Sequence, residues 1–293
     1  MTWDAEVGPP PSESEDPEVW NTWKAAYLTR SQQEFRTRHP WFTFSKDEIH
    51  RHLDPKVRAV GVRVPRVLAV ARGPATSFMD VYARVLREHP GIRHIACKEL
   101  RGHSARQVKV LEIDADGMVC HDHLARARVT LPELAAWLDG KSFLIEKGLS
   151  GPTEPIPFDF KVYVHRGVAR SVLVIDRNRE KTSLTWLDAV TWAHLPWREV
   201  FWYPGFPEWI EGMAPDAGLV ARARVAAEAA TRLVPLLQVS DLFVSLDMYV
   251  KPERVFLGEI TPRPGALHAN RIRIPFIRHA LGNGLGNGGK AGG

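Results

Sequence analysis

Hydrophobic and polar residues recur along the chain with two periods, one typical of helices and one typical of strands. Asp16 before Pro17 predicts a helix start, because an acidic N-cap accepts backbone hydrogen bonds and proline fits the first turn. Three aromatic residues follow at helical spacing: Trp20, Trp23 and Tyr27. A further helix is predicted from Ser77, which has N-cap spacing to Asp80. Its expected apolar stripe consists of Met79, Tyr82 and Leu86.

Two later helices are indicated by a capping box, Thr130 with Glu133, and by an alanine-rich stretch over residues 218–237. Short apolar runs between turn residues predict strands over 67–71, 92–98, 107–113, 143–146, 160–164, 169–175, 242–250 and 255–260. Two of the turns fall at Arg166-Gly167 and at 251–253. This mixture predicts an α+β fold with largely antiparallel sheets instead of a regular βαβ series.

The composition is that of a globular protein, with 44% hydrophobic and 25% charged residues in 293. Two cysteines, Cys97 and Cys120, are too few for a disulfide framework and fit a reducing compartment. No apolar run approaches the roughly 20 residues of a membrane span, and the N-terminus lacks a signal-peptide pattern. We therefore expect a cytoplasmic protein with no membrane partner.

Charge is distributed unevenly along the chain. The net charge is +5, but residues 1–20 hold six acids and no base, so the remaining 273 residues carry 39 bases against 28 acids. An excess of basic residues attracts polyanions, nucleotides or anionic substrates, but does not indicate which of them binds. A solvated basic surface without a partner explains the same excess equally well. Residues 1–15 are expected to form a disordered leader and the glycine-rich residues 282–293 a flexible tail.

The last predicted hairpin carries a pair of carboxylates. If its turn is centred on Glu253, Asp247 falls opposite Glu259, and Ser245 and Thr261 share their face of the sheet. Facing carboxylates repel unless a cation lies between them, and Mg²⁺ is typically held by one or two carboxylates plus phosphates. A pair of solvated acids remains the alternative, although the surrounding apolar residues indicate a buried hairpin.

Three basic residues lie within or at the end of predicted strands: Lys98, Lys161 and Arg177. Together with the acidic pair they could surround a triphosphate. Taken singly, each of them is more typical of a solvated charge on the protein surface than of a binding site.

Four motifs in this order resemble the ATP-grasp enzymes, in particular the teichuronopeptide-biosynthesis-like and ribosomal-protein-S6 glutamate ligase-like branch. Residues 95–104 resemble the strand that bears a lysine and the loop that covers phosphates. Residues 143–149 resemble the adenine-binding hinge, and residues 159–167 the strand that contacts ribose and phosphate. Asp247 with residues 258–265 resembles the metal-binding Asp and the Glu-x-Asn motif.

The resemblance covers about residues 60–275 and implies two α+β subdomains, 67–148 and 149–281, that clasp a nucleotide, with the metal site in the second. The usual N-terminal substrate domain is shortened to a helical segment, 16–66. Acceptor binding is then expected from that segment, from the tryptophan-rich stretch 186–209 or from a partner chain. A homodimer is left open.

Roles for individual residues follow from the same resemblance. Glu146 would meet the adenine amino group, with backbone hydrogen bonds from Lys147 and Leu149. Asp159 would contact ribose, and the phosphates would be neutralised by three cations: Lys98, Lys161 and Arg177. One or two Mg²⁺ ions, or Mn²⁺ in their place, would be bound by Asp247, Glu259 and Thr261. Arg263 would stabilise the acyl oxyanion.

Two positions depart from the family pattern. Thr261 stands where an Asn ligand is usual, and Ser245 stands where many members have an Arg that stabilises the reacting carboxylate. Arg263 matches an Arg of some branches and is expected to replace it.

The implied activity is an ADP-forming carboxylate–amine ligase that uses ATP and Mg²⁺. A small-molecule carboxylate would be activated as an acylphosphate and joined to an amine, an amino acid or peptide. A kinase that phosphorylates a small-molecule hydroxyl keeps the same fold and stays open because of Ser245. A non-catalytic polyanion-binding module is the second alternative. We do not expect nucleic acid as the partner, because carboxylates such as Asp247 and Glu259 repel phosphates without a metal.

Two weaker signals remain. The tryptophan-rich stretch 186–209 would form either a substrate wall or an aromatic plug. The sequence His121-Asp122-His123 could bind a metal, but two histidines on a turn are more typical of polar surface.

Overall fold

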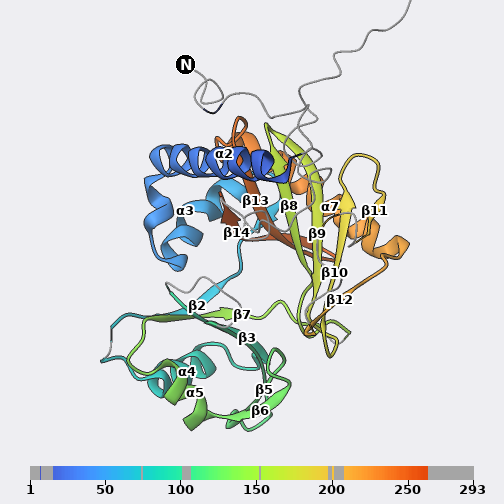
Figure 1. Ribbon diagram of the computed structural model, residues 1–293. Helices are drawn as coiled ribbons and strands as arrows, with labels where there is room; N and C mark the ends of the chain where they lie inside the picture. Colours follow the sequence, from blue (N-terminus) through green and yellow to red (C-terminus); the bar gives the residue numbers. More distant parts are fainter. Residues whose placement is uncertain are drawn as a thin grey trace, which may run out of the picture.

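The computed structural model describes residues 7, 16–73, 75–100, 107–151, 153–196, 200 and 208–262. Several sequence predictions lie outside these residues: the tail 282–293, the leader apart from Val7, the loop 101–104 and Arg263. Within the described part of the chain, two sheets face each other across a gap, each with its own helices (Figure 1). No helix of this part is long and apolar enough to cross a membrane.

The large sheet holds eight strands in the order β1-β14-β13-β8-β9-β10-β11, with β12 paired to β10. Their bounds are Val62–Arg63 (β1), Arg254–Thr261 (β14), Phe243–Lys251 (β13), Asp159–His165 (β8), Val168–Asp176 (β9), Thr182–Asp188 (β10), His194–Leu195 (β11) and Ile210–Gly212 (β12). Only the pairings β1–β14 and β10–β12 are parallel among those described.

The small sheet holds six antiparallel strands in the order β2-β7-β3-β4-β5-β6. Their bounds are Val67–Ala71 (β2), Phe143–Lys147 (β7), His94–Glu99 (β3), Val108–Ile113 (β4), Val119–Asp122 (β5) and Ala127–Thr130 (β6). The predicted α+β architecture with largely antiparallel sheets is confirmed, because hairpins and not crossover helices join most neighbouring strands.

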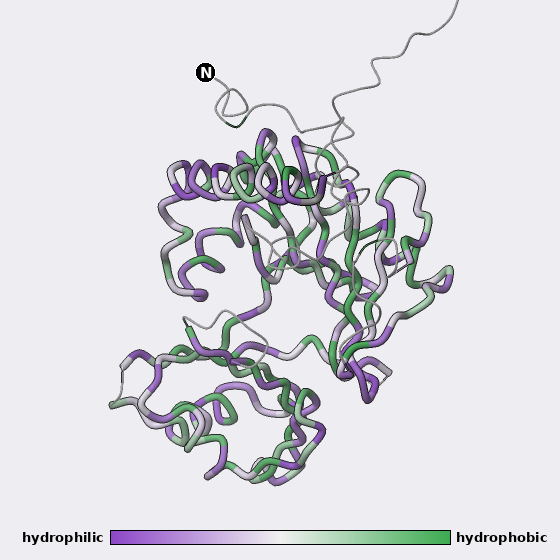
Figure 2. The backbone as a smooth tube through the Cα atoms, viewed as in Figure 1, coloured by the Kyte–Doolittle hydropathy of each residue, from purple (hydrophilic) through white to green (hydrophobic). Residues whose placement is uncertain are grey.

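Helices pack on both faces of the large sheet and on one face of the small sheet. On the large sheet, α7 (Ala217–Leu236) covers one face and shares its core with α3 (Lys46–Arg58), whereas the N-terminal part of α2 (Pro17–Arg38) packs on the other face; the short 3₁₀ helix η1 (Pro40–Thr43) lies between α2 and α3 in sequence. The small sheet is covered by α4 (Phe78–Glu88) and α5 (Leu131–Leu138). Hydrophobic stretches follow the strands and the inward sides of the helices (Figure 2), so each sheet has its own apolar core.

Local signals placed several elements correctly. Asp16 caps α2 by accepting a hydrogen bond from the Glu18 N–H, and the capping box of Thr130 and Glu133 begins α5. The turn between β8 and β9 has positive φ at Arg166 (51°) and at Gly167 (77°), the conformation of a tight hairpin turn.

The predicted apolar stripe of α4 is confirmed only in part, because Tyr82 belongs to the buried face whereas Met79 does not. Met79 is 39% exposed and Leu86 is only half-buried, whereas Phe78, Val81, Tyr82 and Val85 are buried. The helix carries two overlapping apolar stripes, and packing against the small sheet selects the one that begins at Phe78.

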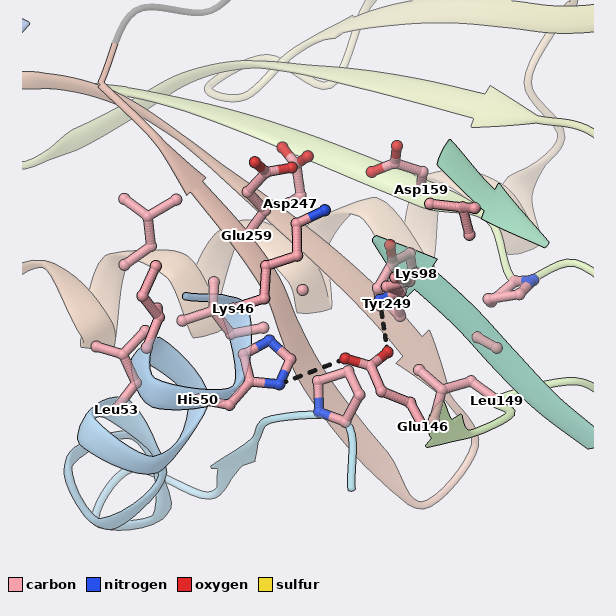
Figure 3. A pocket seen from close by; sticks show the side chains of 18 of the residues that line it. Lys46, His50, Leu53, Lys98, Glu146, Leu149, Asp159, Asp247, Tyr249 and Glu259 are labelled. Carbon is pink, nitrogen blue, oxygen red and sulfur yellow. Dashed lines mark ion pairs between the residues drawn. The ribbon is translucent and has the colours of Figure 1, made fainter. Parts of the chain in front are cut away.

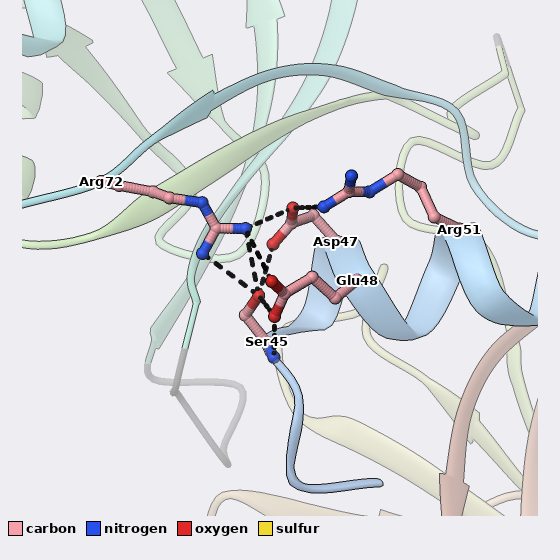
Figure 4. Close-up of polar contacts among 5 residues, drawn as sticks. All are labelled: Ser45, Asp47, Glu48, Arg51 and Arg72. Carbon is pink, nitrogen blue, oxygen red and sulfur yellow. Dashed lines mark hydrogen bonds and ion pairs between the residues drawn. The ribbon is translucent and has the colours of Figure 1, made fainter. Parts of the chain in front are cut away.

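The N-terminal segment is joined to the small sheet by an ion cluster at the start of α3 (Figure 4). Ser45 and Glu48 form a capping box, a feature that the sequence analysis overlooked. The buried carboxylate of Asp47 accepts from Arg72, which follows β2, at 2.7 Å and from Arg51 at 3.1 Å. The cluster therefore fixes α3 between the two sheets, where its side chains reach the space between them.

A second polar contact lies inside the core beside α2. The Tyr27 hydroxyl lies 2.5 Å from Nε2 of His165, and both residues are buried. Burial lowers the pKa of His165 to about 4, and the positive charge of Arg170 acts in the same direction. His165 is therefore neutral in the folded protein at neutral pH.

Candidate active site

A cleft of about 850 Å³ lies between the two sheets and is lined by α3, β3, β7, β8, β13 and β14 (Figure 3). Nine of the predicted site residues line it: Lys98, Glu146, Lys147, Leu149, Asp159, Lys161, Arg177, Asp247 and Glu259. Thr261 is half-buried and pairs with Ser245 two residues beyond the carboxylate pair, but it does not line the cleft. The structure thus brings together residues separated by up to 161 positions, counted from Lys98 to Glu259.

Asp247 and Glu259 are direct cross-strand partners, as predicted, but the turn alone does not align them. The turn is centred between Pro252 and Glu253, since Lys251 pairs with Arg254, and that register would place Asp247 opposite Gly258. A bulge between Asp247 and Met248 shifts the register by one residue and restores the carboxylate pair. Asp247 is 5% exposed, whereas Glu259 is exposed to the cleft.

Lys161 is the cation closest to the acidic group. It forms a short ion pair with Asp247 and lies 3.3 Å from Asp159, to which Arg177 also comes within 3.5 Å. Burial opposes the charge of Lys161, but the two carboxylates outweigh it and hold the lysine pKa well above its usual value. Burial raises the pKa of Asp247 to about 7, against the influence of Lys161 and with that of Asp159 and Glu259.

A second ion pair lies on the small-sheet side of the cleft. Nζ of Lys98 lies 2.5 Å from Oε2 of Glu146, and Nδ1 of His50 lies 3.4 Å from Oε1 of the same carboxylate. Glu146 is only 2% exposed. The hinge beside it is already hydrogen-bonded, because the backbone N–H of Lys147 donates to the Arg66 carbonyl at 2.8 Å. A contact from Lys147 to a base would then have to come from its carbonyl.

Three buried polar atoms of the lining residues make no hydrogen bond within the described part of the chain. They are Nδ1 of His50, Oε1 of Glu146 and Oδ1 of Asp159. Buried polar atoms in folded proteins normally have a partner, either from the protein, from water or from a ligand. Nδ1 of His50 and Oε1 of Glu146 lie 3.4 Å apart, beyond good hydrogen-bond geometry, and Oδ1 of Asp159 has no such neighbour, so this cleft has room for a polar ligand.

The donors around Asp247 fit a hard divalent cation. Carboxylate oxygens come from Asp247, from Glu259 opposite it and from Asp159 on the neighbouring strand. Mg²⁺ prefers such oxygen donors and keeps positions for water and phosphate. The pKa of Asp247 is raised mainly by burial, and the negative charges of Asp159 and Glu259 act in the same direction.

Several lining residues were not assigned to the site from the sequence, among them Lys46 and His50 on α3 and Tyr249 on β13. Lys46 extends toward Asp247 and Glu259 in Figure 3. Burial lowers the pKa of Lys46, and the negative charge of Glu259 acts in the opposite direction. The capping box at Ser45 and the helical spacing of His50, Leu53 and Val57 could have revealed this helix, although not its place in the cleft.

The N-terminal segment also lines one end of the cleft with apolar side chains. Trp41 and Phe42 of η1 and Ile49 and Leu53 of α3 are the apolar lining residues from this segment, and Arg36 of α2 also lines the cleft. The tryptophan-rich stretch lies elsewhere in its described part, where Trp186 is buried and stacks on Tyr163 with a centroid distance of 5.2 Å. Trp197 and Trp202 lie outside the described residues.

Comparison with known proteins gives only distant similarity. No protein-family model matches the chain, and no curated protein matches it. The ATP-grasp ligase PsnB, solved with a minimal precursor, Mg and ADP, is 12% identical with a TM-score of 0.40 over 84% of this chain and 60% of its own.

Two further solved structures are similar at the same level. D-alanine–D-alanine ligase from Bacillus anthracis is 16% identical, with a TM-score of 0.38 over 72% of this chain and 55% of its own. VanG D-Ala:D-Ser ligase from Enterococcus faecalis is 16% identical, with a TM-score of 0.42 over 76% and 53%. The chain thus spans less than two thirds of each of these proteins, and values this low do not assign it to a family.

Proposed function

We propose that the protein is an ATP-dependent carboxylate–amine ligase of the ATP-grasp type that forms ADP. The observation that carries this proposal is the convergence, in one cleft between two sheets, of three cations with a paired set of carboxylates. Phosphoryl transfer needs this combination, because it depends mainly on positioning and on neutralising charge. The four sequence motifs support the same assignment independently of the geometry.

The nucleotide would lie between the sheets. Glu146, Lys147 and Leu149 would contact the base at the hinge, and Asp159 would contact ribose. Lys98 would then leave its pair with Glu146 to neutralise phosphate together with Lys161 and Arg177. The buried atoms without hydrogen-bond partners support a polar ligand at this place.

One or two Mg²⁺ ions would be held by Asp247 and Glu259, with the Thr261 hydroxyl as a weaker ligand. When bound, such ions supply positive charge to the β- and γ-phosphates. Asp247 is presented by the bulged register of β13 and β14, and its burial excludes competing water. Lys161 would exchange its ion pair with Asp247 for a contact with phosphate.

The carboxylate substrate would bind at the N-terminal end of the cleft. Its apolar part would pack on Trp41 and Phe42, and its charge would be met by Lys46 or Arg36. A carboxylate oxygen would attack the γ-phosphorus, the bond to the β-phosphate oxygen would break, and ADP would leave. An amine would then displace phosphate from the acylphosphate and lose one proton, giving an amide. We further propose that Arg263 stabilises the developing oxyanion.

Calorimetric titration with a non-hydrolysable ATP analogue, with and without Mg²⁺, tests the site. We expect Mg²⁺-sensitive binding that Lys98→Ala weakens by about 10- to 100-fold, the worth of a hydrogen bond to a charged group. Lys141→Ala is the matched control, because Lys141 is an exposed lysine that pairs with Glu99 on the same sheet outside the cleft.

Removal of Lys98 leaves the buried Glu146 without its strongest partner, so a folding defect must be separated from lost binding. The double variant Lys98→Ala/Glu146→Gln removes that charge. Binding by the double variant as tight as that of the wild type would overturn the nucleotide site.

One observation favours the alternative reaction, in which a phosphoryl group is transferred to the hydroxyl of a small molecule. Ser245 is buried and its hydroxyl donates to Oδ1 of Asp247 at 3.3 Å, at the position where an arginine would assist a reacting carboxylate. Product analysis separates the two reactions. A ligase forms an amide and ADP only when an amine is present, whereas a kinase forms a stable phosphate ester without one.

A further inference from the structure

Two histidines and a glutamate gather on the small sheet, apart from the groups assigned to the nucleotide. His94 on β3 pairs in register with Glu112 on β4, and Glu112 pairs with His121 on β5, so these side chains share one face. His123 follows β5, and its backbone N–H donates to the Val110 carbonyl at 2.8 Å. One potential ligand atom from each of His94, Glu112 and His123 lies within 4.8 Å of the other two.

Two ring nitrogens of this cluster are buried without a hydrogen bond. Nδ1 of His94 and Nε2 of His123 make none within the described part of the chain. Nε2 of His123 lies 3.3 Å from Oε2 of Glu112. Nε2 of His123 thus has a carboxylate beside it, whereas Nδ1 of His94 has left water without gaining a hydrogen bond, which is costly and points to a bound group that the described chain does not supply.

We propose that His94, Glu112 and His123 bind one Zn²⁺ ion. Imidazole and carboxylate are its usual ligands, at Zn–N and Zn–O distances that separate tetrahedral ligand atoms by about 3.3 Å. The His123–Glu112 contact already has this separation, and side-chain rotation would bring His94 to it. Mg²⁺ does not suit the site, because it prefers oxygen ligands.

The exposure of the three residues suits an ion that enters from solvent. The His123 side chain is 11% exposed and that of Glu112 is 48% exposed, so one side of the cluster is open. Three protein ligands then leave a fourth position for water or for a group of a second molecule. His121 also lies close, with its ring centroid 4.8 Å from that of His123.

The ion would connect this cluster to the cleft. The carbonyl of His94 accepts from the Gly148 N–H in the hinge at 2.9 Å, and Leu124, next to His123, lines the cleft. Arg126 of the same turn donates to the carbonyl of Glu180, in the loop that joins β9 to β10 of the large sheet, at 2.5 Å. A Zn²⁺ ion would fix both the hinge contact and this turn.

Calorimetric titration of metal-free protein with Zn²⁺ alone tests the site, using protein without a histidine tag and without nucleotide. We expect a bound ion whose affinity is reduced by about 100-fold in His123→Gln and in Glu112→Gln, since even indirect partners of a metal contribute about 10- to 100-fold. His194→Gln is the matched control, because His194 is exposed on β11 of the other sheet.

Two results would overturn the proposal: no stoichiometric binding by the wild type, or binding that neither variant weakens. Circular dichroism of Glu112→Gln, a nearly isosteric change on an exposed side chain, shows whether the fold is intact. Co²⁺ gives an independent readout, because four-coordinate Co²⁺ absorbs visible light strongly. A weak octahedral spectrum that is the same in Glu112→Gln would mean adventitious surface binding only. None of these measurements depends on the nucleotide site, so either proposal can fail alone.

Discussion

A methyl group at position 258 tests how the carboxylate pair is aligned. Gly258 is the extra residue of the bulge in β14, between Leu257, which pairs with Met248, and Glu259. A Cβ built there would lie 2.5 Å from Cε2 of Tyr249, 3.1 Å from its Cζ and 3.2 Å from its hydroxyl. Ordinary contact would require the ring to retreat by about 1 Å, and this kind of overpacking costs about 1–3 kcal/mol.

The expected effect on stability depends on the tyrosine. Replacing glycine by alanine restricts the unfolded chain and contributes about 0.4–1 kcal/mol of stability where no clash occurs. Gly258→Ala should therefore lower the free energy of unfolding by about 1–2 kcal/mol in the wild type. In a Tyr249→Leu background it should have no cost or be stabilising. Urea denaturation of the four proteins measures the coupling, which we expect to be at least about 1 kcal/mol.

The same variant should affect the candidate metal site, because Tyr249 lines the cleft two residues after Asp247. We expect weaker Mg²⁺-dependent nucleotide binding in Gly258→Ala. Gly151→Ala is the control, since a Cβ there would meet only Nζ of Lys251 at 3.8 Å. A Gly258→Ala protein of wild-type stability, or an equal cost in the Tyr249→Leu background, would refute the argument from packing.

Three further predictions concern single groups. Asp247→Asn should abolish turnover and the Mg²⁺ dependence of nucleotide binding while metal-free binding persists; an active variant would contradict the metal assignment. The pKa of His165 is about 4 in the folded protein and 6.5 in the unfolded chain. The free energy of unfolding should therefore be highest above about pH 6.5, where both states are neutral at His165, and fall by about 2 kcal/mol from pH 7 to pH 5 as the unfolded chain takes up a proton. Denaturation curves of His165→Gln across this range should lack that part of the slope. Asp47→Ala should lower the free energy of unfolding by about 1–3 kcal/mol and weaken nucleotide binding, because it removes the ion pair that joins α3 to Arg72. Arg51→Ala removes only an exposed partner of Asp47, so it should leave denaturation curves and nucleotide binding nearly unchanged.

Local chemistry explains the parts of the fold that could be predicted. The helix start at Asp16, the capping box at Thr130 and the hairpin turn at Arg166-Gly167 each depend on neighbours in sequence, and each is observed. The α4 stripe was right at Tyr82 and wrong at Met79, because burial there depends on packing against the small sheet. Phe78 and Met79 are adjacent and both apolar, yet one is fully buried and the other 39% exposed.

The prediction that Asp247 faces Glu259 is correct, but the position of the turn explains it only in part. Asp247 faces Glu259 only because the bulge at Gly258 compensates for a turn that is half a residue away from the assumed centre. Nothing in a count of residues from the turn reveals a bulge, since a bulge reflects the twist of the sheet and the space left by Tyr249.

The sequence by itself determined the classes of element and the residue types for binding a phosphorylated ligand, since both follow from periodicity and side-chain chemistry. Tertiary structure alone decided that α3 enters the cleft with Lys46 and His50, because the ion cluster of Asp47 and Arg72 forms between segments 25 residues apart. It also decided that His94 and Glu112 meet His123. That contact depends on the register of neighbouring strands, which no local pattern encodes.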